Sequence, residues 1–187
     1  MVMKQLVSLF KRLVGGRAAS DSADVRSIVL MQRRAYRFSE DELRMASERG
    51  WGKAFDGKED PMYFVSANDP LRVVKAGRHI IHVSSNPSRY SDDDAYALSQ
   101  LPRQEQKRAW IEHNACTFLE FFNDYSSSSD RVSDAGAYAS LATLAVQLGD
   151  PNCVAIFIPN KNIMMPNDGT AEEGLRRFIR KGLPRKG

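Results

Sequence analysis

Three side chains near the middle of the chain have the types that acid–base or nucleophilic chemistry needs: His113, Cys116 and Glu120. A neighbouring histidine can activate a cysteine as a nucleophile, and a carboxylate held among apolar residues can have a raised pKa and act as an acid. A small hydrolase with a pocket near these three residues is therefore one hypothesis. Against it, no third group that would orient the histidine is evident, and residues three apart on a strand face opposite sides. We expect a core cysteine beside a strand-end histidine, with Glu120 facing solvent.

The other two histidines, His79 and His82, flank a pair of isoleucines in a predicted strand. Their spacing places them on opposite faces, so they cannot bind one metal ion as a pair. The acidic run 92–94 lacks the alternating ligands and the glycine of a calcium loop, and it is typical of a helix start. Phosphate-binding glycine loops and paired zinc cysteines are absent. The sequence therefore predicts no metal site and no cofactor.

Residues 113–130, HNACTFLEFFNDYSSSSD, join an apolar run to a polar one. Four apolar side chains predict a buried strand, and Asp124, Tyr125 and four serines follow it as a predicted loop. Exposed loops commonly display binding groups. The candidate binding residues are His113, Glu120, Asp124 and Tyr125.

Hydrophobic periodicity and capping residues define the elements that must position these groups. Strands are predicted at 27–32, 62–67, 71–77, 78–85, 114–122, 153–159 and 163–166, and helices after Ser39, Ser91, Pro102, Ser133 and Thr170. A helical alternative stays open for part of 114–122, and it would place His113 and Cys116 on one face. This order predicts an α+β fold with one mixed, mostly antiparallel sheet, helices packed mainly on one face, and a split βαβ unit in the second half.

Residues 1–14 have the apolar stripe of an amphipathic helix, with basic residues on the other face. Two glycines end it, and a small polar linker follows. We therefore expect a helix and flexible linker at 1–24 and a single α+β domain at 25–187. A basic amphipathic helix can lie on an anionic membrane surface, which gives a peripheral membrane protein as an alternative function. Instead of binding a membrane, this helix could pack on the domain or on a second copy of the chain. The residues that would make either contact are Lys4, Leu6, Phe10, Lys11 and Arg12.

The formal net charge of +4 comes mostly from the two ends of the chain. Because aromatic and basic residues do not interleave as in an RNA-binding sheet, the composition argues against a nucleic-acid partner. No apolar segment reaches the roughly 18 residues that a spanning helix needs. Lys11 and Arg12 interrupt the one stretch that could pass for a signal peptide. Cys116 and Cys153 both lie in apolar runs, which favours a reducing, cytoplasmic compartment but leaves one disulfide open.

The pattern of residues 113–166 resembles a known family. A strand opens with His113, Asn114 and Ala115, an alanine-rich helix follows, and the apolar run CVAIFIP leads into NKNIMMPN. This order is similar to an uncharacterised bacterial α+β domain family, domain of unknown function 4261. The resemblance implies an α+β fold and a bacterial source, and it carries over no catalytic residue.

Taken together, these observations favour a non-catalytic binding or interaction domain in the bacterial cytosol. A well-formed predicted core, exposed polar loops and the absence of a catalytic spacing support this function. A protein partner, self-association and an anionic membrane surface all remain open as partners.

Overall fold

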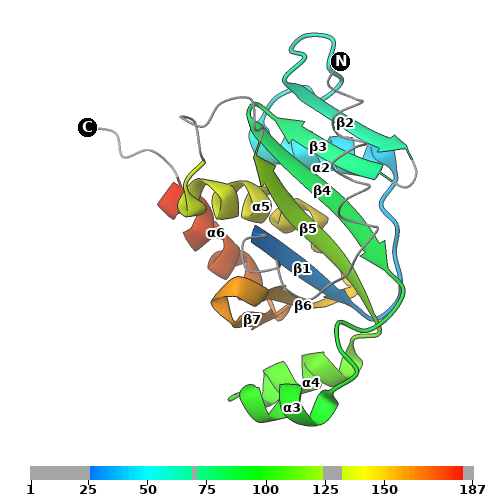
Figure 1. The fold of residues 1–187 in the computed structure, drawn as a ribbon, viewed down its shortest axis with the longest axis vertical. Helices are drawn as coiled ribbons and strands as arrows, with labels where there is room; N and C mark the ends of the chain where they lie inside the picture. Colours follow the sequence, from blue (N-terminus) through cyan, green and yellow to red (C-terminus); the bar gives the residue numbers. More distant parts are fainter. Residues whose placement is uncertain (1–25, 69–70, 124–131, 183–187) are drawn as a thin grey trace.

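The computed structural model describes residues 26–68, 71–123 and 132–182 (Figure 1). Seven strands form one sheet in the order β2-β3-β4-β5-β1-β6-β7, and every pairing between neighbours is antiparallel. The strands are β1 (Arg26–Gln32), β2 (Tyr63–Asn68), β3 (Leu71–Ala76), β4 (His79–Asn86), β5 (Ala115–Asn123), β6 (Cys153–Ile158) and β7 (Ile163–Pro166). The helices are α2 (Glu40–Trp51), α3 (Asp94–Gln100), α4 (Gln104–Glu112), α5 (Asp134–Leu148) and α6 (Ala171–Gly182), with a 3-10 turn at Pro159–Lys161. The predicted α+β class is confirmed.

The second half of the chain forms the predicted split βαβ unit. β5 and β6 both pair antiparallel with β1, which lies between them, so they run parallel to each other. α5 makes the connection and packs across β1. A helix of this length is needed because parallel strands cannot be joined by a tight turn.

The larger core lies between the sheet and the helices α2, α5 and α6, which cover one face. Strand residues alternate in direction, so Leu30, Ile81 and Leu119 point toward these helices and are fully buried. α5 is apolar on most of its surface because the sheet covers one side and α6 the other. Figure 1 shows α5 and α6 side by side.

α3 and α4 interrupt the connection between the neighbouring strands β4 and β5 and project from the lower end of the molecule in Figure 1. α4 contacts β6 and β7. Its Trp110 is buried with Met31, Cys116 and Met164 in a second, smaller cluster on the other face of the sheet. The helices are therefore mainly, but not all, on one face.

Several predicted boundaries are confirmed. Ser39 and Glu42 form a reciprocal capping box at the start of α2, and Ser133 caps α5, which ends at Gly149. The cap of α3 is Asp93 rather than Ser91. α4 starts at Gln104, two residues after Pro102.

The helical alternative for 114–122 is wrong. Residues Ala115–Asn123 form β5, which hydrogen-bonds to β1 on one side and β4 on the other. With partners on both edges, this strand has its backbone donors and acceptors satisfied within the sheet, and its alternate residues Leu119 and Phe121 reach the larger core.

Both outer strands of the described sheet are protected against pairing with another chain. On β2, the Val65 N–H donates to Phe55 O (3.3 Å), and the Ala67 N–H donates to the Glu40 carboxylate (3.1 Å). On β7, the Met164 carbonyl accepts from the Gln106 side chain (2.8 Å). Because these backbone groups already have partners, addition of a strand at either edge would cost hydrogen bonds.

The predicted helix and linker at 1–24, with Lys4, Leu6, Phe10, Lys11 and Arg12, lie outside the described residues, as do the loop candidates Asp124 and Tyr125. Within the described part of the chain, none of the helices has the length and apolar character required to cross a bilayer.

Candidate binding pocket

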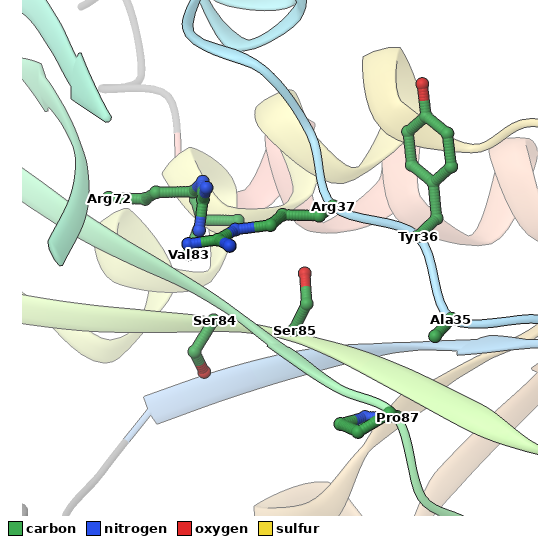
Figure 2. Close-up of a pocket in the computed structure, with 8 residues that line it drawn as sticks. All are labelled: Ala35, Tyr36, Arg37, Arg72, Val83, Ser84, Ser85 and Pro87. Atoms are coloured by element: carbon green, nitrogen blue, oxygen red, sulfur yellow. The ribbon is translucent and has the colours of Figure 1, made fainter. Parts of the chain in front are cut away.

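A pocket of about 400 Å³ opens where the segment between β1 and α2 crosses the core-side face of β3 and β4. Figure 2 shows the residues that line it, which come from this segment and from the two strands. They are Ala35, Tyr36, Arg37, Arg72, Val83, Ser84, Ser85 and Pro87. Its size is in the range of sites that hold small organic ligands.

The segment between β1 and α2 is fixed at both ends, and this positions Arg37. At the first end, the Asn152 side chain accepts from the Arg34 N–H (3.1 Å) and donates to the Arg34 carbonyl (2.9 Å). At the other end, Phe38 is buried and Ser39 begins α2. Arg37 therefore projects from a short stretch of chain with little freedom to move.

Arg72 reaches the pocket from β3. It shares the strand face of Val74, whose side chain lies in the larger core. Its Nε atom donates to the Phe38 carbonyl (3.1 Å), which ties the strand to the segment that carries Arg37. The bond also fixes the plane of the guanidinium, because the Nε–H and the two terminal nitrogens are coplanar.

In Figure 2, the side chains of Arg37 and Arg72 extend toward each other, and the Ser85 hydroxyl points into the space between them while Ser84 points away. The Ser85 Oγ atom is buried and has no hydrogen-bond partner among the described residues. A buried hydroxyl without a partner is costly, and a bound group that accepted its hydrogen bond would remove this cost.

Arginine guanidinium groups remain charged at any physiological pH, and their planar forks match carboxylate and phosphate oxygens. The acidic neighbour Glu42 accepts bonds from the Tyr36 hydroxyl and from the backbone N–H of Ser39 (2.7 Å). The Tyr36 bond comes first among the causes that lower the pKa of Glu42. This carboxylate is thus committed to the helix start. Beside the two arginines, Val83 and Pro87 form apolar walls of the pocket.

A row of polar side chains continues from the pocket across the sheet. Ser85 lies opposite Thr117, and the Thr117 hydroxyl donates to Gln32 Oε1 (2.9 Å). Gln32 is 1% exposed, and its Nε2 atom has no partner among the described residues. Buried polar groups of this kind are commonly bridged by an ordered water.

His113 does not lie at this pocket. It ends α4, is fully buried, and accepts a hydrogen bond at Nε2 from the Tyr90 N–H (3.1 Å), while Nδ1 donates to the Trp110 carbonyl. Burial is the main cause that lowers the pKa of His113. The bond to the Trp110 carbonyl opposes this effect, and the nearby Arg89 charge adds a smaller lowering. Both ring nitrogens are therefore occupied, which leaves neither to activate Cys116.

Cys116 and Glu120 do not interact with His113 either. Burial raises the pKa of the Cys116 thiol to about 12, so the thiolate that nucleophilic attack requires is scarce. Glu120 points to the face opposite α2 and α5, as expected, but it is only 31% exposed and its carboxylate contacts His82 Nδ1 (3.2 Å). The structure therefore does not bring the three residues of the hydrolase hypothesis together in one site.

His79 and His82 do lie on opposite faces, as predicted. His79 is on the core side, where its Nδ1 atom contacts the Ser140 hydroxyl. Ser140 is buried in α5 and also bonds to the Gly136 carbonyl (3.2 Å). This serine bonds to the preceding helical turn, as helix serines commonly do, and it is closed to a substrate.

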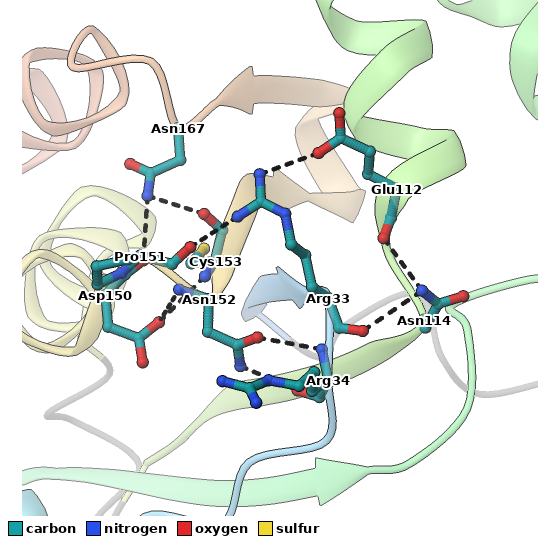
Figure 3. A network of polar contacts seen from close by, with 9 residues as sticks. All are labelled: Arg33, Arg34, Glu112, Asn114, Asp150, Pro151, Asn152, Cys153 and Asn167. Atoms are coloured by element: carbon teal, nitrogen blue, oxygen red, sulfur yellow. Dashed lines mark hydrogen bonds and ion pairs between the residues drawn. The ribbon is translucent and has the colours of Figure 1, made fainter.

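A second polar network joins the ends of β1, α4 and the α5–β6 turn (Figure 3). Arg33 donates to the Pro151 carbonyl (2.7 Å) and to the Glu112 carboxylate (3.0 Å). The amide of Asn167 donates to the carbonyls of Asp150 (3.3 Å) and Cys153 (2.9 Å). Most acceptors in this network are backbone carbonyls. The network therefore holds the loops in place and offers no open site.

The sequence pattern did not single out Arg37, Arg72 or Ser85. One signal was available, because Arg72 alternates with Val74 and Ala76 and so lies on the core-facing side of a predicted strand. A charged residue at such a position needs a partner or a functional role. The position of Arg37 gave no comparable signal, because it lies in an irregular segment.

No group of three or more histidine, cysteine, aspartate or glutamate side chains within the described ranges is arranged to hold a metal ion. Comparison of the chain with protein-family models, with curated proteins and with solved structures found no significant match.

Proposed function

We propose that this protein is a non-catalytic binding domain, and that its ligand is a small molecule with an anionic group bound between Arg37 and Arg72. The observation that carries the proposal is the convergence of two guanidinium groups and an unpartnered, buried Ser85 hydroxyl in one pocket of about 400 Å³. Each of these groups can donate a hydrogen bond to an oxyanion.

The walls of the pocket narrow the class of ligand. Ala35, Val83 and Pro87 offer apolar contact next to the arginines. A ligand that carries a carboxylate or phosphate on an apolar or aromatic body would contact both the arginines and the apolar walls. A free inorganic anion would use only the charged part, and we expect it to bind more weakly.

Titration with phenyl phosphate, benzoate and inorganic phosphate tests this proposal, with binding followed by calorimetry and by amide chemical shifts. Arg37→Gln and Arg72→Gln should each weaken binding of the aromatic anions by about tenfold or more, since a hydrogen bond to a charged group contributes roughly 1.5–3 kcal/mol. Ser85→Ala should give a smaller loss. Arg108→Gln, an exposed arginine on α4, is the matched control and should leave binding unchanged.

Two results would overturn the proposal. In the first, none of the three anions saturates the protein at millimolar concentration. In the second, Arg108→Gln and the pocket variants lose the same amount of binding affinity. The second would indicate a general charge effect rather than a site, because surface charges act on anions at long range. All titrations should be run at the same ionic strength, because salt screens such long-range charge effects.

We also place the protein in a bacterial cytosol. The observation in favour is that Cys116 and Cys153 are both buried and form no disulfide, as is usual in a reducing compartment. The resemblance of residues 113–166 to domain of unknown function 4261 remains part of this proposal. The hydrolase alternative gains no support from the positions of His113, Cys116 and Glu120.

A further inference from the structure

The three hydrogen-bond donors of the pocket come from three different parts of the chain. Arg37 belongs to the segment between β1 and α2, whereas Arg72 lies on β3 and Ser85 on β4. The antiparallel register of β3 and β4, continued by one pair, places Arg72 opposite Val83. Ser85 lies two residues further along β4 on the same face, so it is a diagonal neighbour of Arg72, with Cα atoms roughly 7–8 Å apart. An anion held between the two arginines therefore also meets the Ser85 hydroxyl.

These donors approach the anion from directions that do not share a plane. The Ser85 hydroxyl rises from the sheet, and Arg37 comes from the segment that crosses the sheet (Figure 2). Arg72 starts on the sheet and is tied to that segment by its bond to the Phe38 carbonyl, so it forms the side of the site between the other two. A carboxylate has two oxygens whose lone pairs lie in one plane, and it cannot meet three such donors in good geometry.

The charge of the pocket favours an anion with more than one negative charge. Two guanidinium groups carry two positive charges at physiological pH. None of the 8 described residues that line the pocket is acidic. A carboxylate or a sulfonate would balance one of these charges, whereas a phosphate monoester carries about 1.5–2 negative charges at pH 7.

We propose that the ligand is a small phosphate monoester, whose three terminal oxygens accept hydrogen bonds from Arg37, Arg72 and Ser85. This inference rests on the proposed function, because it concerns the anion held between the same two arginines. The three oxygens of a tetrahedral phosphoryl group point in three directions, as the donors require. The ester oxygen then carries the organic part of the ligand, which contacts the apolar walls at Val83 and Pro87.

Ligands that share a phenyl group separate the shape of the anion from its charge. Phenyl phosphate is tetrahedral with close to two charges, benzenesulfonate is tetrahedral with one, and benzoate is planar with one. Calorimetric titration of the full-length protein at pH 7.5 and one ionic strength should give affinities that fall in this order. Phenyl phosphate should bind about tenfold or more tightly than benzoate, since it gains a further charge-assisted hydrogen bond. Inorganic phosphate should bind more weakly than phenyl phosphate, because it makes no contact with the apolar walls.

Two serine variants test the third contact. Ser85→Ala should weaken the binding of phenyl phosphate and benzenesulfonate by a larger factor than the binding of benzoate. Ser84→Ala is the matched control, because this neighbouring side chain points away from the arginines (Figure 2), and it should change none of the affinities. Each comparison is made between ligands on one variant, so a general loss of stability in a variant does not affect its outcome.

The outcomes distinguish this inference from the proposed function. Benzoate that binds as tightly as phenyl phosphate, with both losing affinity in Arg37→Gln and Arg72→Gln, would overturn the phosphate assignment and leave the anion pocket in place. Equal affinities for inorganic phosphate and phenyl phosphate would overturn the ester in favour of a free oxyanion. The same loss in Ser85→Ala for all three phenyl ligands would overturn the three-point contact. Absence of binding by every anion would overturn both the inference and the proposed function.

Discussion

The backbone N–H of Tyr90 donates a hydrogen bond to Nε2 of His113, 3.1 Å away. Because Nδ1 donates to the Trp110 carbonyl, the imidazole needs one protonated and one bare nitrogen, which is the neutral form. The ring thereby ties the start of the α3–α4 region to the end of α4. A protonated ring would place a second N–H against the Tyr90 N–H and lose this bond.

Acid should therefore destabilise the fold before its carboxylates are protonated. Burial lowers the pKa of His79 and is the main cause that lowers the pKa of His113, below the usual 6.5. The unfolded chain then binds more protons than the folded one as pH falls below 6.5, so stability rises with pH in this range and is fully present above it. Urea unfolding at pH 5.0, 6.0 and 7.5 measures the slope.

The matched variants for this prediction are His79→Gln and His113→Gln, which cannot titrate. Each should show a smaller loss of stability between pH 7.5 and 5.0 than the original protein, whatever its stability at pH 7.5. An equal slope in all three proteins would contradict the prediction and would assign the acid sensitivity to carboxylates.

The two thiols should be inert in the folded protein. Burial raises the pKa of Cys116 and of Cys153 to about 12, and the thiolate is the form that reacts with alkylating agents. Treatment with iodoacetamide at pH 8 should modify neither residue within hours, whereas both should react in 6 M guanidinium. Mass spectrometry of the two samples checks this. Rapid modification of Cys116 alone without denaturant would restore the hydrolase hypothesis.

α5 and α6 approach so closely near Gly182 that a methyl group should not fit there. A Cβ at this position would lie 2.6 Å from the Ala135 carbonyl oxygen and closer still to the Ala139 side chain. Gly182→Ala should therefore lower the unfolding free energy by about 1–3 kcal/mol, as overpacking usually does. Gly149→Ala is the control, because its nearest neighbour would be at an ordinary 3.5 Å. Equal melting temperatures for the two variants would contradict the close packing.

Local signals in the sequence were enough to predict much of the fold. Ser39 and Ser133 act as helix caps where their spacing indicated, and the apolar run CVAIFI forms a buried strand flanked by β1 and β7. Such features depend on residues a few positions apart. The split βαβ unit followed from the order of these elements.

The binding pocket could not be predicted in the same way, because it depends on residues distant in the chain. Arg37 and Arg72 are brought together only when the segment after β1 crosses β3, and that path is set by the bonds from Asn152 to Arg34. The same limitation applies to His113. Its residue type suggested catalysis, but its partners Tyr90 and Trp110 belong to a fold contact that no spacing in the sequence indicates.

Phe121 and Phe157 have similar apolar sequence surroundings but differ in burial. The apolar patterns around Phe121 and Phe157 predict that both are buried, but only Phe121 is, at 4% exposed, while Phe157 packs half-buried against Tyr90. Phe121→Ala should cost about 3–5 kcal/mol of unfolding free energy, as for other buried phenylalanines. Phe157→Ala should cost clearly less, because its side chain keeps contact with water and leaves a smaller cavity. Chemical denaturation of both variants measures the difference, and a larger loss in Phe157→Ala would show that the second cluster, rather than the α5 side, dominates stability.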